Sequence, residues 1–323
     1  MNNEMSELAP IVLFVYNRPM HTKLTLNALK NNSLASESKL YIYADGAKKD
    51  ANAEVLDQIA DVRQMIRSQQ WCGEIEIIES EKNNGLANSI KAGVSYIVEK
   101  YGKVIVMEDD LVTSPAFLSY MNKNLEFYQN RKSVFSIGAY SYPKGKFKIP
   151  DDYQFDVFVS LRNSSWGWAT WQDRWEQIDW SISCYSTLTD KMKKALNRGG
   201  DDVYDLLEMQ QSGKLKIWSI QFTMAHFINH AVSILPCISY VDNVGLDGSG
   251  ENCSVSNGLR NDYLNQKETI RFLDVLYEDS RIINAFYNVN CRKKRVIWKK
   301  VLNRICRIIG KQPLFYLKKK IYL

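Results

Sequence analysis

Short apolar runs alternate with longer amphipathic segments over the first 140 residues. The apolar runs are rich in β-branched residues and have the length of buried strands. We predict strands over residues 11–16, 40–44, 75–78, 103–107 and 134–139. Between them, apolar residues recur at helical spacing. This spacing predicts helices over residues 22–30, 52–68, 86–101 and 115–129, the last with Ser114 as its N-cap. Such alternation predicts an α/β fold with a doubly wound, mostly parallel sheet and helices on both faces.

Tryptophans gather in the second half of the chain. Five of the eight lie between Trp166 and Trp180. They form either a structural aromatic cluster or, at Trp166, Trp168 and Trp171, a platform for an acceptor sugar, because indole faces stack on apolar faces of other rings. The sequence leaves both interpretations open.

Charge divides the chain into a body and a tail. The net charge is +6, yet residues 292–323 hold twelve Lys or Arg and no acid, whereas the rest holds 30 basic and 36 acidic residues. Apolar positions in this tail, among them Trp298, follow a helical stripe. That pattern is typical of an interfacial helix on an anionic membrane surface, and a helix packed on the acidic body is the alternative. The body shows no nucleic-acid-binding motif, so we expect no nucleic-acid partner.

These features predict one domain over residues 1–290 and a basic amphipathic helical tail over 291–323. We predict neither a signal peptide nor a spanning segment, and the six cysteines have no metal-ligand spacing. The expected location is the cytoplasm, at the inner face of the cytoplasmic membrane.

Three consecutive acids follow the fourth predicted strand: Glu108, Asp109 and Asp110. Open α/β sheets bind ligands at the C-terminal ends of their strands. Adjacent carboxylates repel one another, so burial requires a cation or hydrogen-bond donors. Their oxygens suit Mg²⁺ or Mn²⁺, which can bridge to a diphosphate. On this run alone, a solvated acidic turn is the better interpretation.

Five motifs in a fixed order favour a ligand site over a solvated turn. They are Tyr-Asn-Arg-Pro, Ala-Asp-Gly, Asn-Asn-Gly-Leu-Ala, Met-Glu-Asp-Asp-Leu and Trp-Gly-Trp-Ala-Thr-Trp. In this order the chain resembles the GT-A nucleotide-sugar transferases over residues 10–253. It is most similar to bacterial family-2-like sugar transferases and more remotely to N-acetylglucosaminyltransferase I. The resemblance implies a GT-A fold with a nucleotide-binding half at 10–140 and an acceptor-side half at 141–290. It also implies transfer of a sugar from a nucleotide-diphosphate donor, with UDP preferred.

The resemblance also implies roles for single residues. Arg18 would contact the nucleotide, and Asp45 would accept the N–H of the uracil ring. Glu108 would bind the donor sugar, Asp109 the ribose, and Asp110 a catalytic Mn²⁺ or Mg²⁺.

The loop after the third strand would complete the donor site. Its polar residues are Asn83, Asn84, Ser89 and Lys91. Related enzymes carry a donor-contacting histidine about where Ser89 stands, so this chain departs from the family there.

The general base is less well defined. Relatives carry an acid in a motif that begins with tryptophan, but this chain has Ser219 there. Asp247 and Glu251 are the nearest substitutes, and Asp173 is a third candidate. A second departure is the absence of a histidine near Cys253.

Together these features predict a metal-dependent, inverting hexosyl- or N-acetylhexosaminyltransferase. Its acceptor would be a lipid-linked surface glycan of the lipopolysaccharide or capsule type. One alternative is a binding protein of the same fold with impaired catalysis. The other is a sugar nucleotidyltransferase, which the glycine-free Tyr-Asn-Arg-Pro motif disfavours.

Overall fold

The computed structural model describes residues 7–249 and 257–291. The predicted basic tail and Glu251 lie outside these ranges. Among the described helices, none has both the length and the apolar character needed to cross a bilayer.

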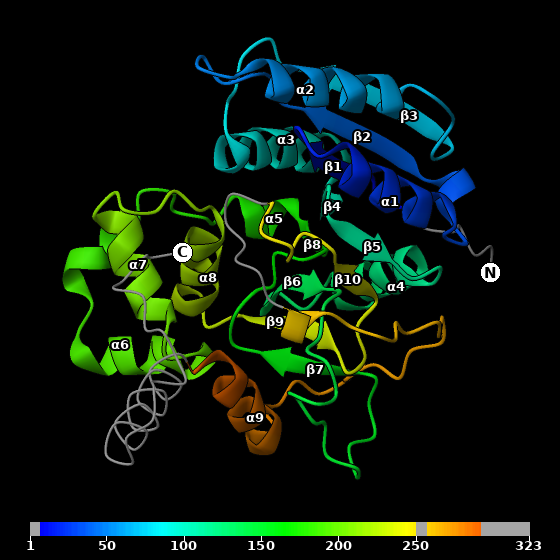
Figure 1. The fold of residues 1–323 in the computed structure, drawn as a ribbon. Coiled ribbons are helices and arrows are strands. Elements are labelled where there is room, and N and C mark those ends of the chain that lie inside the picture. The colour runs from blue at the N-terminus through cyan, green and yellow to red at the C-terminus, as the bar shows by residue number, and fades with distance from the viewer. Residues whose placement is uncertain (1–6, 250–256, 292–323) are drawn as a thin grey trace, which may run out of the picture.

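One eight-stranded sheet runs through both halves of the chain, in the order β3-β2-β1-β4-β8-β6-β9-β7 (Figure 1). A two-stranded sheet pairs β10 with β5. The strands are β1 Ile11–Val15, β2 Lys39–Ala44, β3 Glu74–Glu79, β4 Lys103–Glu108, β5 Leu111–Thr113, β6 Val134–Gly138, β7 Val157–Ser160, β8 Trp168–Trp171, β9 Val232–Pro236 and β10 Val241–Asn243. The β1–β2, β2–β3, β1–β4 and β6–β9 pairs are parallel, and β8 runs antiparallel to both β4 and β6. The predicted mostly parallel α/β sheet is therefore confirmed.

Alternating side chains of the central strands feed two separate cores. Ile11 and Leu13 of β1 face one core, and Val12 and Phe14 face the other. Helices α1, α2 and α4 cover the first face, while α3 and α8 cover the second. The helices are α1 Pro19–Lys30, α2 Ala53–Ile66, α3 Leu86–Tyr101, α4 Phe117–Tyr128, α5 Gln172–Trp175, α6 Asp190–Leu196, α7 Val203–Gln211, α8 Ser219–Ile228 and α9 Ser280–Asn290. A sheet covered on both faces explains why its central strands are apolar at every position.

One predicted helix start is wrong. Helix α4 begins at Phe117, and its N-cap position is Ala116, with no side-chain cap. Ser114 lies further upstream, and its carbonyl oxygen accepts a hydrogen bond from the Phe117 N–H at 3.1 Å. A turn therefore precedes the helix where the sequence predicted a cap.

The strand order places a switch point beside β1. The chain runs from β1 outward through β2 to β3, and then returns to place β4 on the other side of β1. At such a point the loops after neighbouring strands diverge and leave a crevice for a ligand. The first acid, Glu108, still belongs to β4 and pairs with Phe14 of β1, so the acidic run opens into this crevice.

His226 is a packing residue of α8. Its ring is buried and contacts the hydroxyls of Ser136 and Ser233 through Nε2 at 2.9 and 3.2 Å. His230 lies beyond the end of α8 and is exposed. The two histidines therefore do not share a helix face.

Acid should destabilise the protein through His226. Burial lowers the pKa of His226 from 6.5 to about 4. The unfolded chain binds its proton first, so stability present above pH 6.5 is lost as the pH falls towards 4. We expect a loss on the order of 1–3 kcal/mol from this residue. The free energy of unfolding, measured in urea above pH 6.5 and near pH 4, gives the size of this loss. In His226→Gln the acid-dependent loss should shrink, whereas His230→Asn should behave like the unaltered protein.

Candidate active site

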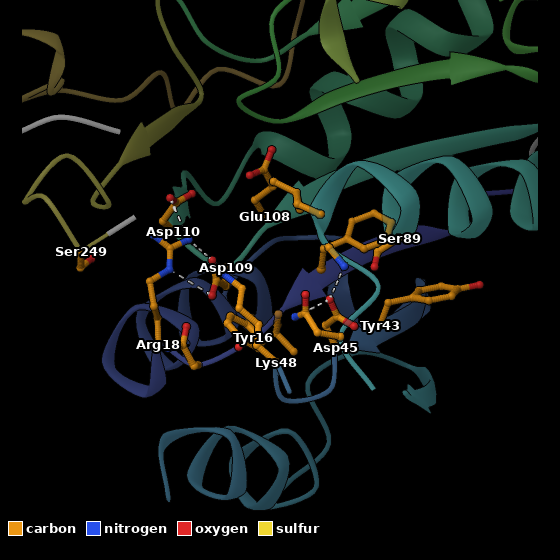
Figure 2. A pocket seen from close by; sticks show the side chains of 16 residues that line it. Tyr16, Arg18, Tyr43, Asp45, Lys48, Ser89, Glu108, Asp109, Asp110 and Ser249 are labelled. Carbon is orange, nitrogen blue, oxygen red and sulfur yellow. Dashed lines mark hydrogen bonds and ion pairs between the residues drawn. The ribbon is translucent and has the colours of Figure 1, made fainter. Parts of the chain in front are cut away.

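A pocket lies at the C-terminal ends of β1, β2 and β4, at the switch point (Figure 2). Its lining combines aromatic side chains with charged and polar ones. The lining residues are Phe14, Val15, Tyr16, Asn17, Arg18, Tyr43, Asp45, Lys48, Asn83, Gly85, Leu86, Ser89, Glu108, Asp109, Asp110 and Ser249. The strand ends that the sequence marked as polar thus meet in one place.

Asp45 organises the floor of this pocket. Its Oδ1 accepts the backbone N–H groups of Gly46 and Asn84, each at 2.9 Å. Its Oδ2 accepts the N–H of Gly85 at 3.0 Å and the side-chain amide of Asn83 at 3.1 Å. Both carboxylate oxygens therefore hold the loop that leads into α3. Asp45 already accepts these four hydrogen bonds, so an N–H of a nucleobase would be a fifth donor to the same carboxylate.

Not all of the predicted loop residues face the pocket. Ser89 and Asn83 line it. Asn84 instead directs its side chain to the Ser80 hydroxyl at 3.0 Å. Lys91 is exposed and lies over the ring of Trp180, with Nζ 4.9 Å from the ring centroid. The donor-binding prediction for Asn84 and Lys91 is not supported, because their side chains are engaged elsewhere.

Two of the three acids contact a single arginine. Arg18 precedes α1, and its Nε donates to Asp109 Oδ2 at 3.3 Å. Its Nη2 contacts both Asp109 Oδ1 and, at 3.0 Å, Asp110 Oδ2. Figure 2 shows the guanidinium reaching both carboxylates while Glu108 points away from them. The backbone anchors this arrangement, since Thr25 donates to the Asp109 carbonyl and Val244 to that of Asp110, both at 2.8 Å.

The proximity of these groups changes their protonation. Burial, reinforced by Asp110 and Asp109, raises the pKa of Glu108 to about 8. Burial also raises the pKa of Asp109 to about 6, although Arg18 opposes this change. Burial alone would lower the pKa of Arg18, but the two aspartates raise it instead. Glu108 therefore keeps its proton to a higher pH than an exposed carboxylate does, and its carboxyl group can hydrogen-bond a sugar hydroxyl in either protonation state.

The acids have the right atoms for a divalent cation, but they are not arranged as a preformed cage. Among the described residues, no group of three or more His, Cys, Asp or Glu side chains is placed to hold a metal ion. Asp110 is buried, and Gly245 leaves it room, since a Cβ at Gly245 would lie 2.2 Å from Asp110 Oδ2. The residues thus fit a cation held by one or two carboxylates, with the remaining ligands supplied by a diphosphate and water.

Asp247 lies on the loop after β10, beside a histidine that the sequence did not single out. His21 Nε2 is 3.1 Å from Asp247 Oδ2. Ser249 donates to Asp247 Oδ1 from its hydroxyl and its backbone N–H, and these bonds lower the pKa of Asp247 to about 2. An aspartate with so low a pKa is a weak proton acceptor. No local pattern in the sequence pairs His21 with Asp247, because 226 residues separate them.

Asp247 and His21 lie outside the lining of the pocket. So do Asp173, the third candidate for the base, and Ser219, which stands where relatives carry an acid. Asp173 pairs with Lys132 at 2.5 Å and with Arg174 at 2.6 Å. Ser219 begins α8 and lines a second, smaller cavity with Arg162 and Asn163. Asp173 is therefore a surface ion-pair residue, as its local sequence also allowed.

The predicted tryptophan platform is wrong for Trp168 and Trp171. Both are at least 95% buried, and Trp168 stacks on Trp175 and Trp218 with ring centroids 5.7 and 4.7 Å apart. They belong to strand β8, which lies inside the sheet, so no face remains for a sugar. Trp166 is only partly buried and packs edge-on against Tyr140 at 4.5 Å. The cluster is structural at Trp168 and Trp171, and a platform role stays a prediction for Trp166.

Tyr16, Tyr43 and Lys48 line the pocket but were not predicted. Tyr43 occupies the next-to-last position of β2, where the strand's alternation could have placed it near Asp45. Nothing in the sequence distinguishes Lys48 from other surface lysines.

One family profile and several remote solved structures resemble this chain. The profile of glycosyl transferase family 2 matches residues 11–189. Among solved structures, the chain is similar to S. aureus TarS 1–349, with 12% identity, 72% of this chain and 59% of that chain covered, and a TM-score of 0.40. It is also similar to an active-site mutant of LgtC, with 11% identity, 68% and 70% coverage, and a TM-score of 0.36. A third likeness is to UDP-glucose pyrophosphorylase complexed with UDP-glucose, with 10% identity, 74% and 94% coverage, and a TM-score of 0.38.

A search of curated proteins finds no match. The structural likenesses are too remote to indicate a substrate. The family profile, by contrast, covers more than half of the chain and includes the pocket's acidic run. The chain therefore belongs to glycosyl transferase family 2 and has the GT-A fold.

Proposed function

We propose that this protein is a metal-dependent, inverting transferase that moves a hexosyl or N-acetylhexosaminyl group from a UDP-sugar to a surface glycan. The observation that carries the proposal is the acidic run at the switch point of the sheet, where Arg18 contacts Asp109 and Asp110 and Glu108 lines the same pocket. A nucleotide-diphosphate sugar offers matching chemistry, because it combines an aromatic base, two anionic phosphates and a ring of hydroxyls.

The pocket divides into three parts in this proposal. Tyr43 and Asp45 receive the uracil base. Arg18 meets the diphosphate, since a guanidinium binds phosphate oxygens in a fork. Glu108 contacts the sugar. Asp110 would hold Mn²⁺ or Mg²⁺, which when bound supplies Lewis-acid neutralisation of the leaving diphosphate.

The reaction forms one bond and breaks one. The acceptor oxygen bonds to the anomeric carbon, the bond from that carbon to the UDP oxygen breaks, and the hydroxyl proton goes to a base. Two acids on the loop after β10 are candidates for this base: Asp247, and Glu251 beyond the described part of that loop. Because Asp247 contacts His21, the two can act as a pair in which His21 accepts the proton and Asp247 orients its ring.

The two members of this pair can be separated by kinetics. We expect His21→Gln to lower kcat about 10²-fold, the usual contribution of a general base, with donor affinity unchanged. Asp247→Asn should have a smaller effect of the same kind if it only orients His21. Steady-state transfer rates together with UDP titrations measure both parameters. A larger effect of Asp247→Asn would make Asp247 itself the base, and normal rates in both variants would leave Glu251 as the candidate.

We further propose that the acceptor is lipid-linked, in a glycan of the lipopolysaccharide or capsule type, and that the basic tail holds the enzyme on the inner face of the cytoplasmic membrane. The support is the tail's composition, with twelve basic residues and no acid over 292–323. The described body ends at Cys291, whose Sγ donates to Asp201 Oδ2 at 3.0 Å. A truncation should therefore keep Cys291.

Cutting the chain after Cys291 should abolish binding to anionic vesicles while transfer to a short soluble acceptor continues. Each basic residue near an anionic surface contributes about 1 kcal/mol, and salt screens that attraction. Vesicle co-sedimentation of the full chain and the truncated form, at low and high salt, measures it. If both forms sediment equally with the vesicles at low salt, the proposal that the tail binds the membrane is wrong.

A thermal-shift panel of nucleotide sugars with Mn²⁺ tests the donor class. A ligand that binds only the folded state raises Tm in proportion to its occupancy. We expect UDP-sugars to raise Tm more than GDP- or CMP-sugars, and more with Mn²⁺ than with EDTA. A flat response to every UDP-sugar would refute the proposal.

A second candidate is a protein that binds the donor but does not transfer it. The serine at position 219 and the low pKa of Asp247, about 2, favour it. Such a protein would pass the thermal-shift test and release no UDP. A sugar nucleotidyltransferase remains disfavoured, since the loop after β1 has no glycine.

A further inference from the structure

The arginine at the acidic run stands where a divalent cation would have to bind. Arg18 Nη2 contacts one oxygen of Asp109 and one of Asp110, the latter at 3.0 Å. Both aspartates are at least 95% buried. A magnesium-type ion binds carboxylate oxygens at about 2.0–2.1 Å. The guanidinium and such an ion cannot occupy the space between these two carboxylates at the same time.

Arg18 is also incompletely satisfied in this position. Its Nη1 is buried and has no hydrogen-bond partner among the described residues. The same atom lies 2.9 Å from the point that a Cβ on Gly245 would occupy, so a glycine is what leaves it room. A buried donor without a partner costs free energy, which an incoming acceptor such as a phosphate oxygen would recover.

Two buried aspartates side by side need a cation whether or not a donor is bound. In the structure that cation is Arg18, which lies 91 residues away in sequence from Asp109. Without it, Asp109 and Asp110 would be buried and uncompensated, which is strongly unfavourable. The arginine therefore keeps the empty pocket intact, but it also neutralises the ligands that the ion requires.

We propose that Arg18 is an internal counter-cation that competes with the divalent ion for Asp109 and Asp110 and leaves Asp110 for the diphosphate when ion and donor enter together. This inference rests on the proposed function. It makes Arg18 a positioning residue that couples the two binding events. The enzyme then takes up its metal with the nucleotide and not before it.

Direct measurement of Mn²⁺ binding tests this exchange without any turnover. The electron paramagnetic resonance signal of free Mn²⁺ reports binding to the unaltered protein and to Arg18→Met, each with and without UDP. Without UDP, we expect Arg18→Met to bind Mn²⁺ at least about tenfold more tightly, because a contacting positive charge has been removed. With UDP, this advantage should shrink, because the variant lacks the guanidinium that would meet the diphosphate.

Two further variants test whether Mn²⁺ affinity depends on a positive charge at position 18 in particular and on the shape of the guanidinium. Arg67→Met removes one positive charge from an exposed arginine that pairs with Glu79, and it should leave Mn²⁺ binding unchanged. Arg18→Lys keeps the charge but loses the fork, so its Mn²⁺ affinity without UDP should fall between those of the unaltered protein and Arg18→Met.

The outcomes distinguish the inference from the function beneath it. If Arg18→Met binds Mn²⁺ no more tightly than the unaltered protein while both bind it with UDP, the inference is wrong and the metal-dependent function stands. If no form binds Mn²⁺ even with UDP, both are wrong. Should Arg18→Met be poorly folded, Mn²⁺ must raise its Tm more than that of the unaltered protein, and a failure to do so also overturns the inference.

Discussion

Replacing Asp110 with asparagine should lower the transfer rate by about 10²- to 10³-fold, the scale of several kcal/mol of lost charge stabilisation. Asparagine retains the shape of the side chain but provides no charge for a divalent ion. The fold should survive, because the substitution removes one of three mutually repelling acids. Initial rates of UDP release in saturating Mn²⁺, with circular dichroism as the check on folding, measure the effect.

The matched control for this variant is Asp151→Asn. Asp151 is an exposed aspartate that pairs only locally, with Lys148 at 2.9 Å. It should leave the rate unchanged. Near-normal turnover of Asp110→Asn in Mn²⁺ would show that Asp110 is not the metal ligand.

Replacing Asp45 with alanine should have the second-largest effect. It removes four hydrogen bonds, one to Gly46 and three that hold the loop from Asn83 to Gly85. We expect UDP affinity to fall by about 10- to 100-fold, which corresponds to roughly 1–3 kcal/mol for bonds to a charged group. Isothermal titration of UDP and GDP measures it, and the melting temperature should fall as well.

Comparison of the two nucleotides separates the two roles of Asp45. If the carboxylate also accepts a uracil N–H, the unaltered protein prefers UDP and Asp45→Ala loses that preference. If it acts only on the loop, both nucleotides lose affinity equally. Equal affinity of the unaltered protein for UDP and GDP would contradict the uracil contact.

The strands and most helices were predictable because their signal is local. β4 is apolar at four successive positions before Glu108, and a strand covered on both faces requires such a run. The acidic run was correctly predicted to lie at the end of a strand, because the apolar run before it shows where the strand ends. Ser114 misled because a capping residue and a turn residue look alike in sequence.

The contacts that define the site were less accessible. Arg18 and Asp109 are 91 residues apart, and Asp45 and Gly85 are 40 apart. No local pattern shows that Arg18 neutralises the acids, or that Asp45 holds a loop. The number and spacing of tryptophans likewise do not show which rings are exposed. A tryptophan buried in β8 and one that is free to stack on a sugar cannot be distinguished from the sequence. The family resemblance placed these residues in one pocket, and the structure showed which neighbours they contact.

The most direct test of the central claim is release of UDP by the purified protein. A panel of UDP-hexoses and UDP-N-acetylhexosamines is incubated with Mn²⁺ and a glycan acceptor extract, and free UDP is followed over time. The account predicts that one donor is consumed, that EDTA stops its consumption, and that Asp110→Asn does not consume it. UDP release that continues in EDTA, or at the full rate in Asp110→Asn, would contradict it.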